Sequence, residues 1–343
     1  MPTSVRDPHD PGSDAAGDRA ADVETAAVEP IEVPGGGRIR IGTASWTDPT
    51  MTAAGVFYPT TATNAEERLQ HYAATFPLVE VDATYYALPA ESTAKLWVER
   101  TPPDFVFNVK AFSLLTGHPT RRKALPEDLL DEVAPEHRDK QRFYASHLSA
   151  DGQAEVWRRF RDALLPLDSA AKLGAVLLQY PEWFTPRRSS REELAAIRDR
   201  LPGYRVCVEF RNAAWMATDR DRDRTLGLLR DHNLPLVCLD MPQGFRSSLP
   251  PIAEATSPDL SVVRFHGRDP EAWQRKTVTE RFRYLYSEQE LAEWVPRVDH
   301  LASSAREVHA LMNNCYRDQA VTNAAQLADL LSREDVPVVP AGA

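Results

Sequence analysis

Eight short β-rich runs alternate with helical segments, and this alternation most constrains the fold of the chain. In chain order the runs are 39–43, 78–84, 105–110, 175–180, 205–210, 235–240, 261–265 and 307–312. Strands that are separated by helices form βαβ units and a parallel sheet. Eight such units match the count that closes a (β/α)8 barrel, in which about 250 residues form one domain. The sequence therefore predicts an α/β chain with a single parallel (β/α)8 TIM barrel.

Helices and loops fill the gaps between these runs. Helical periodicity is clearest at 64–75, 92–100, 154–165, 191–200, 222–232, 288–303 and 319–332. Asn64 is expected to cap the first helix, with Glu66 and Glu67 in its first turn. Long insertions at 113–150 and 241–258 follow the third and sixth strands, where a barrel places the loops of its active face. An open doubly wound sheet is the alternative, disfavoured because no Gly-rich phosphate turn follows the first strand.

The two ends of the chain differ in composition from the middle. Residues 1–36 are rich in Asp, Ala, Pro and Gly and are nearly without aromatic side chains. Such a segment buries too little apolar surface to offset the entropy of ordering it. We expect a disordered N-terminal tail over 1–36, one barrel domain over 37–333 and a C-terminal tail over 334–343.

Composition and charge limit the classes of function. The net charge of −10 repels a phosphate backbone at long range, which makes a nucleic-acid partner unlikely on this ground. No apolar stretch reaches the roughly 18 residues that cross a bilayer, and charge and proline stand where a signal peptide needs an apolar core. We therefore expect a cytoplasmic protein without membrane association. The three cysteines, Cys207, Cys238 and Cys315, lack the spacing of a zinc site or a disulfide framework.

Polar side chains recur at the C-terminal end of nearly every predicted strand, after an apolar first half. Residues two apart on a strand face the same way, so such pairs share one face. A purely structural barrel interior would continue as Val, Ile or Leu. Buried charge must pair, bind a ligand or reach water. The predicted active face, a crowded and charge-lined pocket, contains Glu80, Asp82, Asn108, Lys110, Gln179, Glu209, Arg211, Asp240, Arg264, His266, Asn313 and Asn314.

Structural roles compete with functional ones for several of these residues. Glu209 with Arg211, or Asp240 with Arg264, can equally be ion pairs that tie neighbouring strands together. His118, in the long insertion after the third strand, is a further candidate for ligand binding, although most histidines in such loops are simply solvated.

Asparagine and tryptophan residues after the strands also have two interpretations. Asn313 and Asn314 can bind a ligand or cap the start of the last helix. Trp46, Trp183 and Trp215 each follow a strand, where they can line the site. For at least one of the three, packing between helix and barrel is the better interpretation.

A set of motifs occurs in one order along the chain. They are Gly42-Thr43-Ala44-Ser45-Trp46, Phe57-Tyr58-Pro59, Val79 to Tyr86, Phe105 to Lys110, Tyr180-Pro181, Val208 to Arg211 with Trp215, Arg264 to Arg268, and Asn313-Asn314 followed by Asn323-Ala324. Together they resemble the YecE-like family, a domain of unknown function (domain of unknown function 72). The resemblance covers about residues 38–332. It implies a TIM barrel and no established activity.

This chain departs from the pattern of that family at three places. Ala44-Ser45 stands where the family usually has Ser-Gly, Asp82 where Asn is usual, and Met312 where an aromatic residue is usual. Asp82 adds a carboxylate to the predicted site, so a substrate shared with the family is not assured. Tyr85, which lies in the third motif, joins the expected ligand-binding residues.

The leading functional hypothesis is an acid/base enzyme, of the isomerase or hydrolase class, that acts on a small polar or anionic metabolite. The catalytic candidates are Glu209 as first choice, with His266, Glu80 and Asp240. The expected substrate-binding residues are Lys110, Arg211, Arg264, Asn313, Asn314, Trp46, Tyr85, Gln179, Asp82 and His118. Guanidinium groups bind phosphate and carboxylate well, and burial among carboxylates raises the pKa of one of them, as a general acid requires.

Other functions stay open. A divalent-metal enzyme, such as a sugar isomerase or phosphoesterase, would draw its ligands from Glu80, Asp82, Glu209, Asp240 and His266. A glycosidase would need two carboxylates roughly 5 to 9.5 Å apart. A non-catalytic nucleic-acid or regulatory binding protein could hold its partner through the basic run 121–123. Cofactors and oligomeric state are unknown from the sequence.

Overall fold

Eight parallel strands form a nearly closed ring in the computed structural model, which describes residues 26–34, 37–53, 55–275 and 278–333. The strands are β2 (Gly37–Ala44), β3 (Leu78–Val81), β4 (Val106–Lys110), β7 (Leu173–Gln179), β8 (Val206–Glu209), β9 (Val237–Asp240), β10 (Ser261–Phe265) and β11 (Glu307–Met312). Their order is β8-β7-β4-β3-β2-β11-β10-β9, and one bridge, Val208 to Leu236, joins β8 to β9. Every strand of the ring overlaps one predicted run, so the predicted TIM barrel is confirmed.

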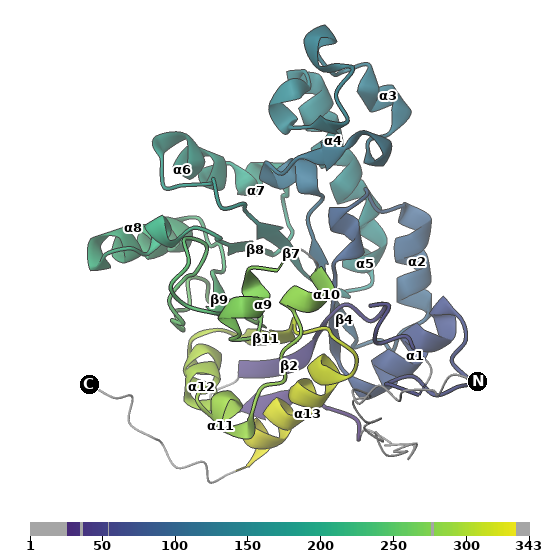
Figure 1. Cartoon of the computed structure of the whole chain (residues 1–343), viewed down its shortest axis with the longest axis vertical. Helices are drawn as coiled ribbons and strands as arrows, with labels where there is room; N and C mark the ends of the chain where they lie inside the picture. The colour runs from purple at the N-terminus through teal and green to yellow at the C-terminus, as the bar shows by residue number, and fades with distance from the viewer. Residues whose placement is uncertain (1–25, 35–36, 54, 276–277, 334–343) are drawn as a thin grey trace, which may run out of the picture.

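Helices cover the outside of this ring. The longer ones are α1 (Ala65–Thr75), α2 (Glu91–Glu99), α4 (Ala150–Ala163), α6 (Arg188–Ala195), α8 (Asp219–Asp231), α12 (Val295–Ser304) and α13 (Gln319–Ser332), and the shorter ones include α5 (Leu165–Ser169), α7 (Ile197–Arg200) and α11 (Glu288–Ala292). Figure 1 shows α1, α2 and α5 along one side of the strands and α11, α12 and α13 along another. Across the described ranges, no helix is long and apolar enough to cross a membrane.

Local sequence signals account for where several helices begin and end. The Asn64 side chain accepts hydrogen bonds from the backbone N–H groups of Glu66 and Glu67, and the Glu67 carboxylate accepts from the Asn64 N–H, which completes a capping box. The segment predicted as one helix over 288–303 is instead α11 and α12, with Pro296 in the first turn of α12. A proline has no N–H to donate, so it favours a helix start over a helix interior.

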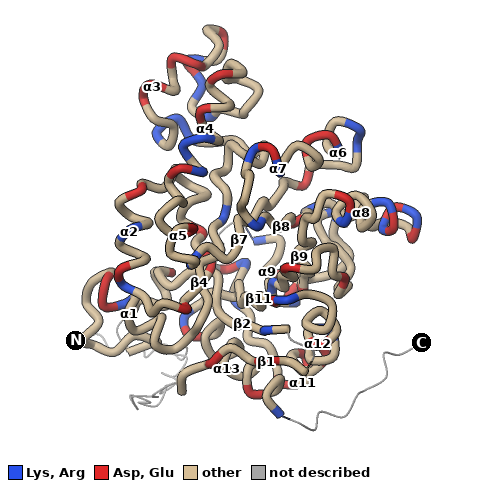
Figure 2. The backbone as a smooth tube through the Cα atoms, turned by 180° about the vertical axis from the view of Figure 1, so that it is seen from behind, with Lys and Arg blue, Asp and Glu red and all other residues tan. Residues whose placement is uncertain are grey.

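The two long insertions lie where they were expected. Residues 113–150 contain α3 (Glu127–Leu130) and a small antiparallel pair, β5 (Thr120–Arg121) with β6 (Arg142–Phe143). This lobe projects at one end of the molecule, and α4 leads back from it toward the barrel (Figure 1). The insertion at 241–258 contains neither helix nor strand. Figure 2 shows positively and negatively charged positions interleaved over the lobe, α6 and α8.

The structure differs from the prediction of a tail that reaches residue 36. Residues Ile31–Val33 form β1, which pairs antiparallel with the start of β2. Ile31 and Val33 pack against the core. β3 pairs with β2 only from Gly42 onward, so it leaves one edge of the first part of β2 open, and β1 pairs with that part. Residues 26–30 and 34 are described without helix or strand, and the other parts of the predicted tails, 1–25, 35–36 and 334–343, lie outside the described residues.

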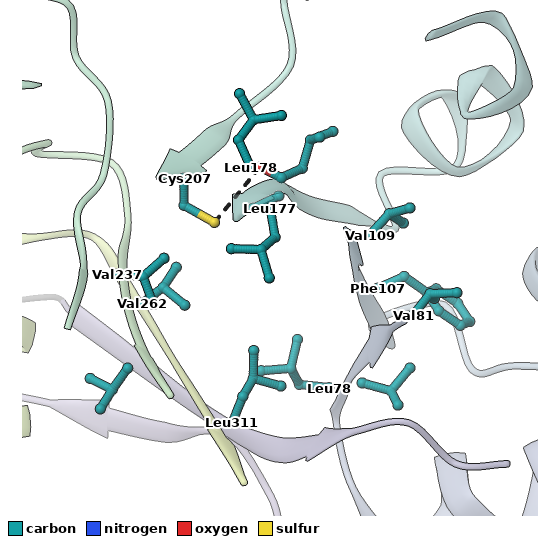
Figure 3. Packing of buried hydrophobic residues seen from close by; sticks show 14 of the residues in the cluster. Leu78, Val81, Phe107, Val109, Leu177, Leu178, Cys207, Val237, Val262 and Leu311 are labelled. Carbon is teal, nitrogen blue, oxygen red and sulfur yellow. Dashed lines mark hydrogen bonds between the residues drawn. The ribbon is translucent and has the colours of Figure 1, made fainter. Parts of the chain in front are cut away.

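The interior of the barrel is apolar in its middle. Figure 3 shows Leu177, Cys207, Val237, Val262 and Leu311 gathered inside the ring of strands. All five are buried, and the Cys207 thiol donates only a long hydrogen bond, 3.7 Å, to the carbonyl oxygen of Val176. This cysteine therefore packs as a small apolar group, as the sequence indicated.

The N-terminal end of the interior is also polar. The sequence did not suggest this, because the first halves of most predicted strands are apolar. Arg40 on β2 donates to Glu307 on β11 at 2.7 Å. The Nδ1 atom of His309 lies 3.0 Å from the side-chain oxygen of Asn108 on β4. Gly174 is glycine because a Cβ there would come within 2.5 Å of that same Asn108 oxygen. Polar groups therefore line both ends of the interior.

Replacing Ser45 by glycine is expected to stabilise the protein. Ser45 follows β2 with a φ of 101°, in the region that favours glycine, and the family resemblance places glycine at this position. Relief of this strain should raise the free energy of unfolding by about 1 kcal/mol, measured by chemical denaturation. Ser303→Gly, an exposed position inside α12, is the matched control and should lower it by roughly 0.5 kcal/mol. A loss of stability in Ser45→Gly would contradict the assignment of strain.

Candidate functional site

Arg264 on β10 forms the centre of a buried ion cluster at the C-terminal end of the barrel. One terminal nitrogen, Nη1, donates to Glu209 Oε2 at 2.5 Å, and the other, Nη2, donates to Glu80 Oε1. The three side chains come from β10, β8 and β3, and strand alternation turns all three into the barrel. None of the three residues is exposed to solvent. They fill the end of the barrel where the sequence predicted a pocket.

Arg211 extends the cluster toward solvent. Its Nε donates to Glu209 Oε1, and its Nη2 lies 3.0 Å from His266 Nε2 and 3.5 Å from the Gln179 side-chain oxygen. The guanidinium carbon is 5.4 Å from the centre of the Trp273 ring, a cation–π distance. The Arg211 side chain keeps 11% of its surface exposed, so it is a cation that a ligand can reach.

Lys110 and Asp82 form an ion pair one layer nearer the C-terminal end than Glu80. Their Nζ and Oδ1 atoms are 3.1 Å apart, and their side chains are 14% and 27% exposed. Lys110 Nζ also lies 5.1 Å from the centre of the Tyr85 ring. This pair therefore lies between the buried cluster and solvent.

His118 lies beside the same cations. Its Nδ1 is 2.9 Å from the Thr116 hydroxyl, and its ring packs edge-on against Tyr85. Burial, together with the positive charges of Lys110 and Arg211, lowers the pKa of His118 to about 4. The ring is neutral at pH 7.

The two carboxyl groups on Arg264 have opposite pKa shifts. Burial raises the pKa of Glu80 to about 7, against the opposing charge of Arg264, and the nearby Asp82 carboxylate contributes to the rise. Burial would also raise the pKa of Glu209, but Arg211 and Arg264 outweigh it and hold that pKa well below its usual value. Glu80 Oε2 is buried and has no hydrogen-bond partner. Glu80 therefore suits proton exchange better than Glu209, the first choice from sequence.

His266 is a positioning group rather than a base at neutral pH. Burial, followed by the charge of Arg211, lowers its pKa to about 3. Arg211, which can only donate, places its Nη2 atom 3.0 Å from Nε2 of the neutral ring. The other ring nitrogen, Nδ1, is 2.7 Å from the side-chain nitrogen of Asn313. Asn313 and His266 thus hold Arg211 in place.

Asp240 does not share this site, so its prediction as a catalytic residue there is wrong in geometry. It is one residue beyond Leu239, the register partner of Arg264, and therefore faces the helices outside the barrel. There it accepts hydrogen bonds from Arg268 at 2.7 Å, Tyr286 at 2.7 Å and the Trp294 indole at 2.6 Å. Asp240 anchors the segment after β10 and the start of α12, and it forms no ion pair with Arg264.

Asn314 and Trp46 also lie away from the ion cluster. Asn314 donates to the carbonyl oxygen of Tyr284 and to the Asn323 side chain, both at 2.8 Å, so it joins a loop to α13. It does not cap that helix, whose N-cap residue is Asp318. Trp46 is 7% exposed and packs edge-on against Trp97 of α2 at 6.0 Å. Both residues have structural surroundings instead of the predicted ligand contacts.

Asn108 contacts His309 at the N-terminal end of the interior and does not join the predicted active face. The remaining predicted residues meet as expected: Glu80, Asp82, Lys110, Tyr85, His118, Gln179, Glu209, Arg211, Arg264, His266 and Asn313. Trp273 was missed, because it lies in the segment between β10 and β11 where no strand pattern fixes its place. Two hollows, of 140 Å³ beside Trp157 and of 390 Å³ beside Arg205, lie away from this group. Within the described ranges, no three His, Cys, Asp or Glu side chains could together hold a metal ion.

The pH dependence of stability should reveal the proton on Glu80. A folded-state pKa of about 7, raised from 4.5, gives stability that is complete below pH 4.5 and is lost as the pH rises toward 7. The free energy of unfolding of the wild type, measured relative to that of Glu80→Gln, should therefore fall by about 3 kcal/mol from pH 4.5 to pH 7.5. Urea denaturation at a series of pH values measures this difference. A difference that does not change with pH would contradict the raised pKa.

Comparison with known proteins agrees with the fold and the motifs. The chain is 29% identical over 307 residues to the UPF0759 protein YunF of Bacillus subtilis (strain 168), covering 88% of this chain and 98% of that protein. It is similar to the crystal structure of a DUF72 family protein from Enterococcus faecalis V583, at 26% identity and a TM-score of 0.69 over 87% of this chain and 97% of the other. A DUF72 family protein from Thermotoga maritima MSB8 matches at 29% identity and a TM-score of 0.67, over 86% and 99%. The family model described as "Protein of unknown function DUF72" matches residues 40–342, and the chain therefore belongs to the DUF72 family.

Proposed function

We propose that this protein is an enzyme that performs acid/base chemistry on a small anionic metabolite at the C-terminal end of the barrel. The observation that carries the proposal is the contrast between two carboxyl groups on one guanidinium. Glu80 has a pKa raised to about 7 by burial, whereas the arginines hold the pKa of Glu209 well below its usual value. A group with a pKa near 7 can both give and take a proton at neutral pH. Isomerase and hydrolase reactions use such a group.

Lys110 and Arg211 are the cations that would hold the phosphate or carboxylate of the substrate. Both are partly exposed, whereas Arg264 is fully buried and directs its two terminal nitrogens at Glu80 and Glu209. Arg264 therefore holds the carboxylates in place instead of binding the ligand. Guanidinium and ammonium groups both bind phosphate, the guanidinium with two parallel donors.

An entering anion would also open the way to Glu80. Lys110 is paired with Asp82 at 3.1 Å, and an anion would compete with Asp82 for the ammonium group. Asp82 lies two residues after Glu80, one layer nearer solvent. Its release would expose the unpaired Oε2 atom of Glu80 to the bound substrate. We further propose that the enzyme works in the cytoplasm, where its three free cysteines, Cys207, Cys238 and Cys315, would stay reduced.

Removal of the Lys110 charge should weaken anion binding. Inorganic phosphate, titrated by calorimetry into the full chain, is expected to bind at least about tenfold more weakly to Lys110→Met than to the wild type, because a charged hydrogen bond is lost. Lys95→Met is the control, since Lys95 is exposed on α2 and paired with Glu91. Equal phosphate affinity in Lys110→Met and the wild type would exclude Lys110 from the anion site.

Removal of the Glu80 proton should abolish turnover. A panel of phosphorylated and carboxylated metabolites is incubated with the wild type and followed by NMR for conversion. For any substrate found, Glu80→Gln should lower turnover by about 100-fold or more, because general acid/base catalysis is lost. The matched control is Glu192→Gln, an exposed carboxylate on α6. Full activity in a folded Glu80→Gln protein would remove Glu80 from the reaction.

A further inference from the structure

Four rings form a continuous chain beside the candidate site, which we call the aromatic rim. Tyr86 lies 5.1 Å from Tyr85, Tyr85 lies 5.3 Å from His118, and His118 lies 5.8 Å from Trp183, measured between ring centres. All three pairs are edge-to-face, an arrangement that aromatic rings favour at these separations. The rings come from the segments after β3, β4 and β7, so three neighbouring strands contribute to one rim.

The two outer rings of the rim face water. Tyr86 is 63% exposed and Trp183 is 55% exposed, and both belong to the most exposed large apolar side chains of the described residues. Contact with a ligand would remove this apolar surface from water, which is favourable. Exposed aromatic surface beside a group of polar side chains is typical of a ligand-binding surface.

Positive charge lies directly behind the rim. Lys110 Nζ is 5.1 Å from the centre of the Tyr85 ring. Lys110 and Arg211 both act on His118, whose pKa is lowered to about 4 by burial and by these two charges. The Thr116 hydroxyl lies 2.9 Å from His118 Nδ1 and holds the ring in place. One neutral imidazole ring and two cations thus lie beside the rim.

We propose that the aromatic rim binds the planar ring of a ligand whose phosphate or carboxylate is held by Lys110 and Arg211. The substrate class is then a ring-bearing anion, such as an aryl phosphate or a nucleoside monophosphate. This inference rests on the proposed function for its anion site and adds a binding site for the planar ring of the ligand. Trp183, the exposed ring next to His118, covers one face of the ligand ring. Stacking of this kind accepts any flat π face, so it selects for a ring without selecting one ring.

Two matched pairs of ligands test the ring separately from the anion. Phenyl phosphate is compared with inorganic phosphate, and AMP with ribose 5-phosphate, by calorimetry and by tryptophan fluorescence of the full chain. The ring-bearing member of each pair should bind about tenfold more tightly and quench fluorescence. In Trp183→Leu this preference should fall below about twofold, with the affinity for inorganic phosphate unchanged. Tyr144→Leu, which removes an exposed aromatic ring outside the rim, should keep the full preference.

The outcomes separate this inference from the proposed function. Equal affinity for the two members of both pairs overturns the proposal that the aromatic rim binds a ring, and it leaves the anion site supported. A tenfold preference that Trp183→Leu retains also overturns it, because the ring would then bind elsewhere. A third outcome is that no phosphate binds, but adenosine quenches the tryptophan fluorescence of the wild type and not that of Trp183→Leu. In that case the anion site and the proposed function fail, whereas binding of a planar ring at the aromatic rim is supported. Absence of binding by every probe overturns both.

Discussion

A guanidinium group with no solvent contact lies at the end of the barrel, and its two carboxylate partners come from strands that do not adjoin its own. β9 separates β10 from β8, and β11 and β2 separate it from β3. Taking charges out of water is costly, and pairing offsets the cost only where the geometry is good. In this protein the contacts of Arg264 also help to close the ring of strands. β8 and β9 meet through one bridge, and the contacts of Arg264 with Glu209 and of Arg211 with His266 cross that same seam.

The proposed acid/base chemistry depends on an asymmetry in this cluster. Glu209 bonds to two guanidinium groups, whereas Glu80 bonds to one. Both carboxyl groups are fully buried, but Glu209 has more positive charge beside it, so Glu209 keeps its negative charge whereas the pKa of Glu80 rises to about 7. Environments that separate two neighbouring carboxyl groups in pKa are the usual way in which a fold assigns acid and base roles. The same contacts that close the barrel thus supply a group that titrates near neutral pH.

Most of the barrel follows from the sequence, because alternating strands and helices leave few ways to bury their apolar faces. The alternation of side chains along each strand correctly places Glu80, Glu209 and Arg264 together. It failed for Asp240 because the residue at the end of a strand faces inward or outward according to the register of its neighbours, which one sequence does not give. Trp273 comes from a connecting segment whose path depends on tertiary packing, so no local pattern marks it.

The carboxylate at residue 82, where the family resemblance leads us to expect asparagine, acts on the same proton. A carboxylate at Asp82 places negative charge near Glu80 and contributes to its raised pKa, an effect that a neutral asparagine would not have. Asp82 also takes Lys110 as its ion-pair partner, so the free cation that an asparagine would leave is partly neutralised here. Both effects act in one direction, because each favours the protonated form of Glu80. Under the proposed function, an anion at Lys110 would compete with Asp82, so residue 82 would couple the charge of that ligand to the protonation of Glu80.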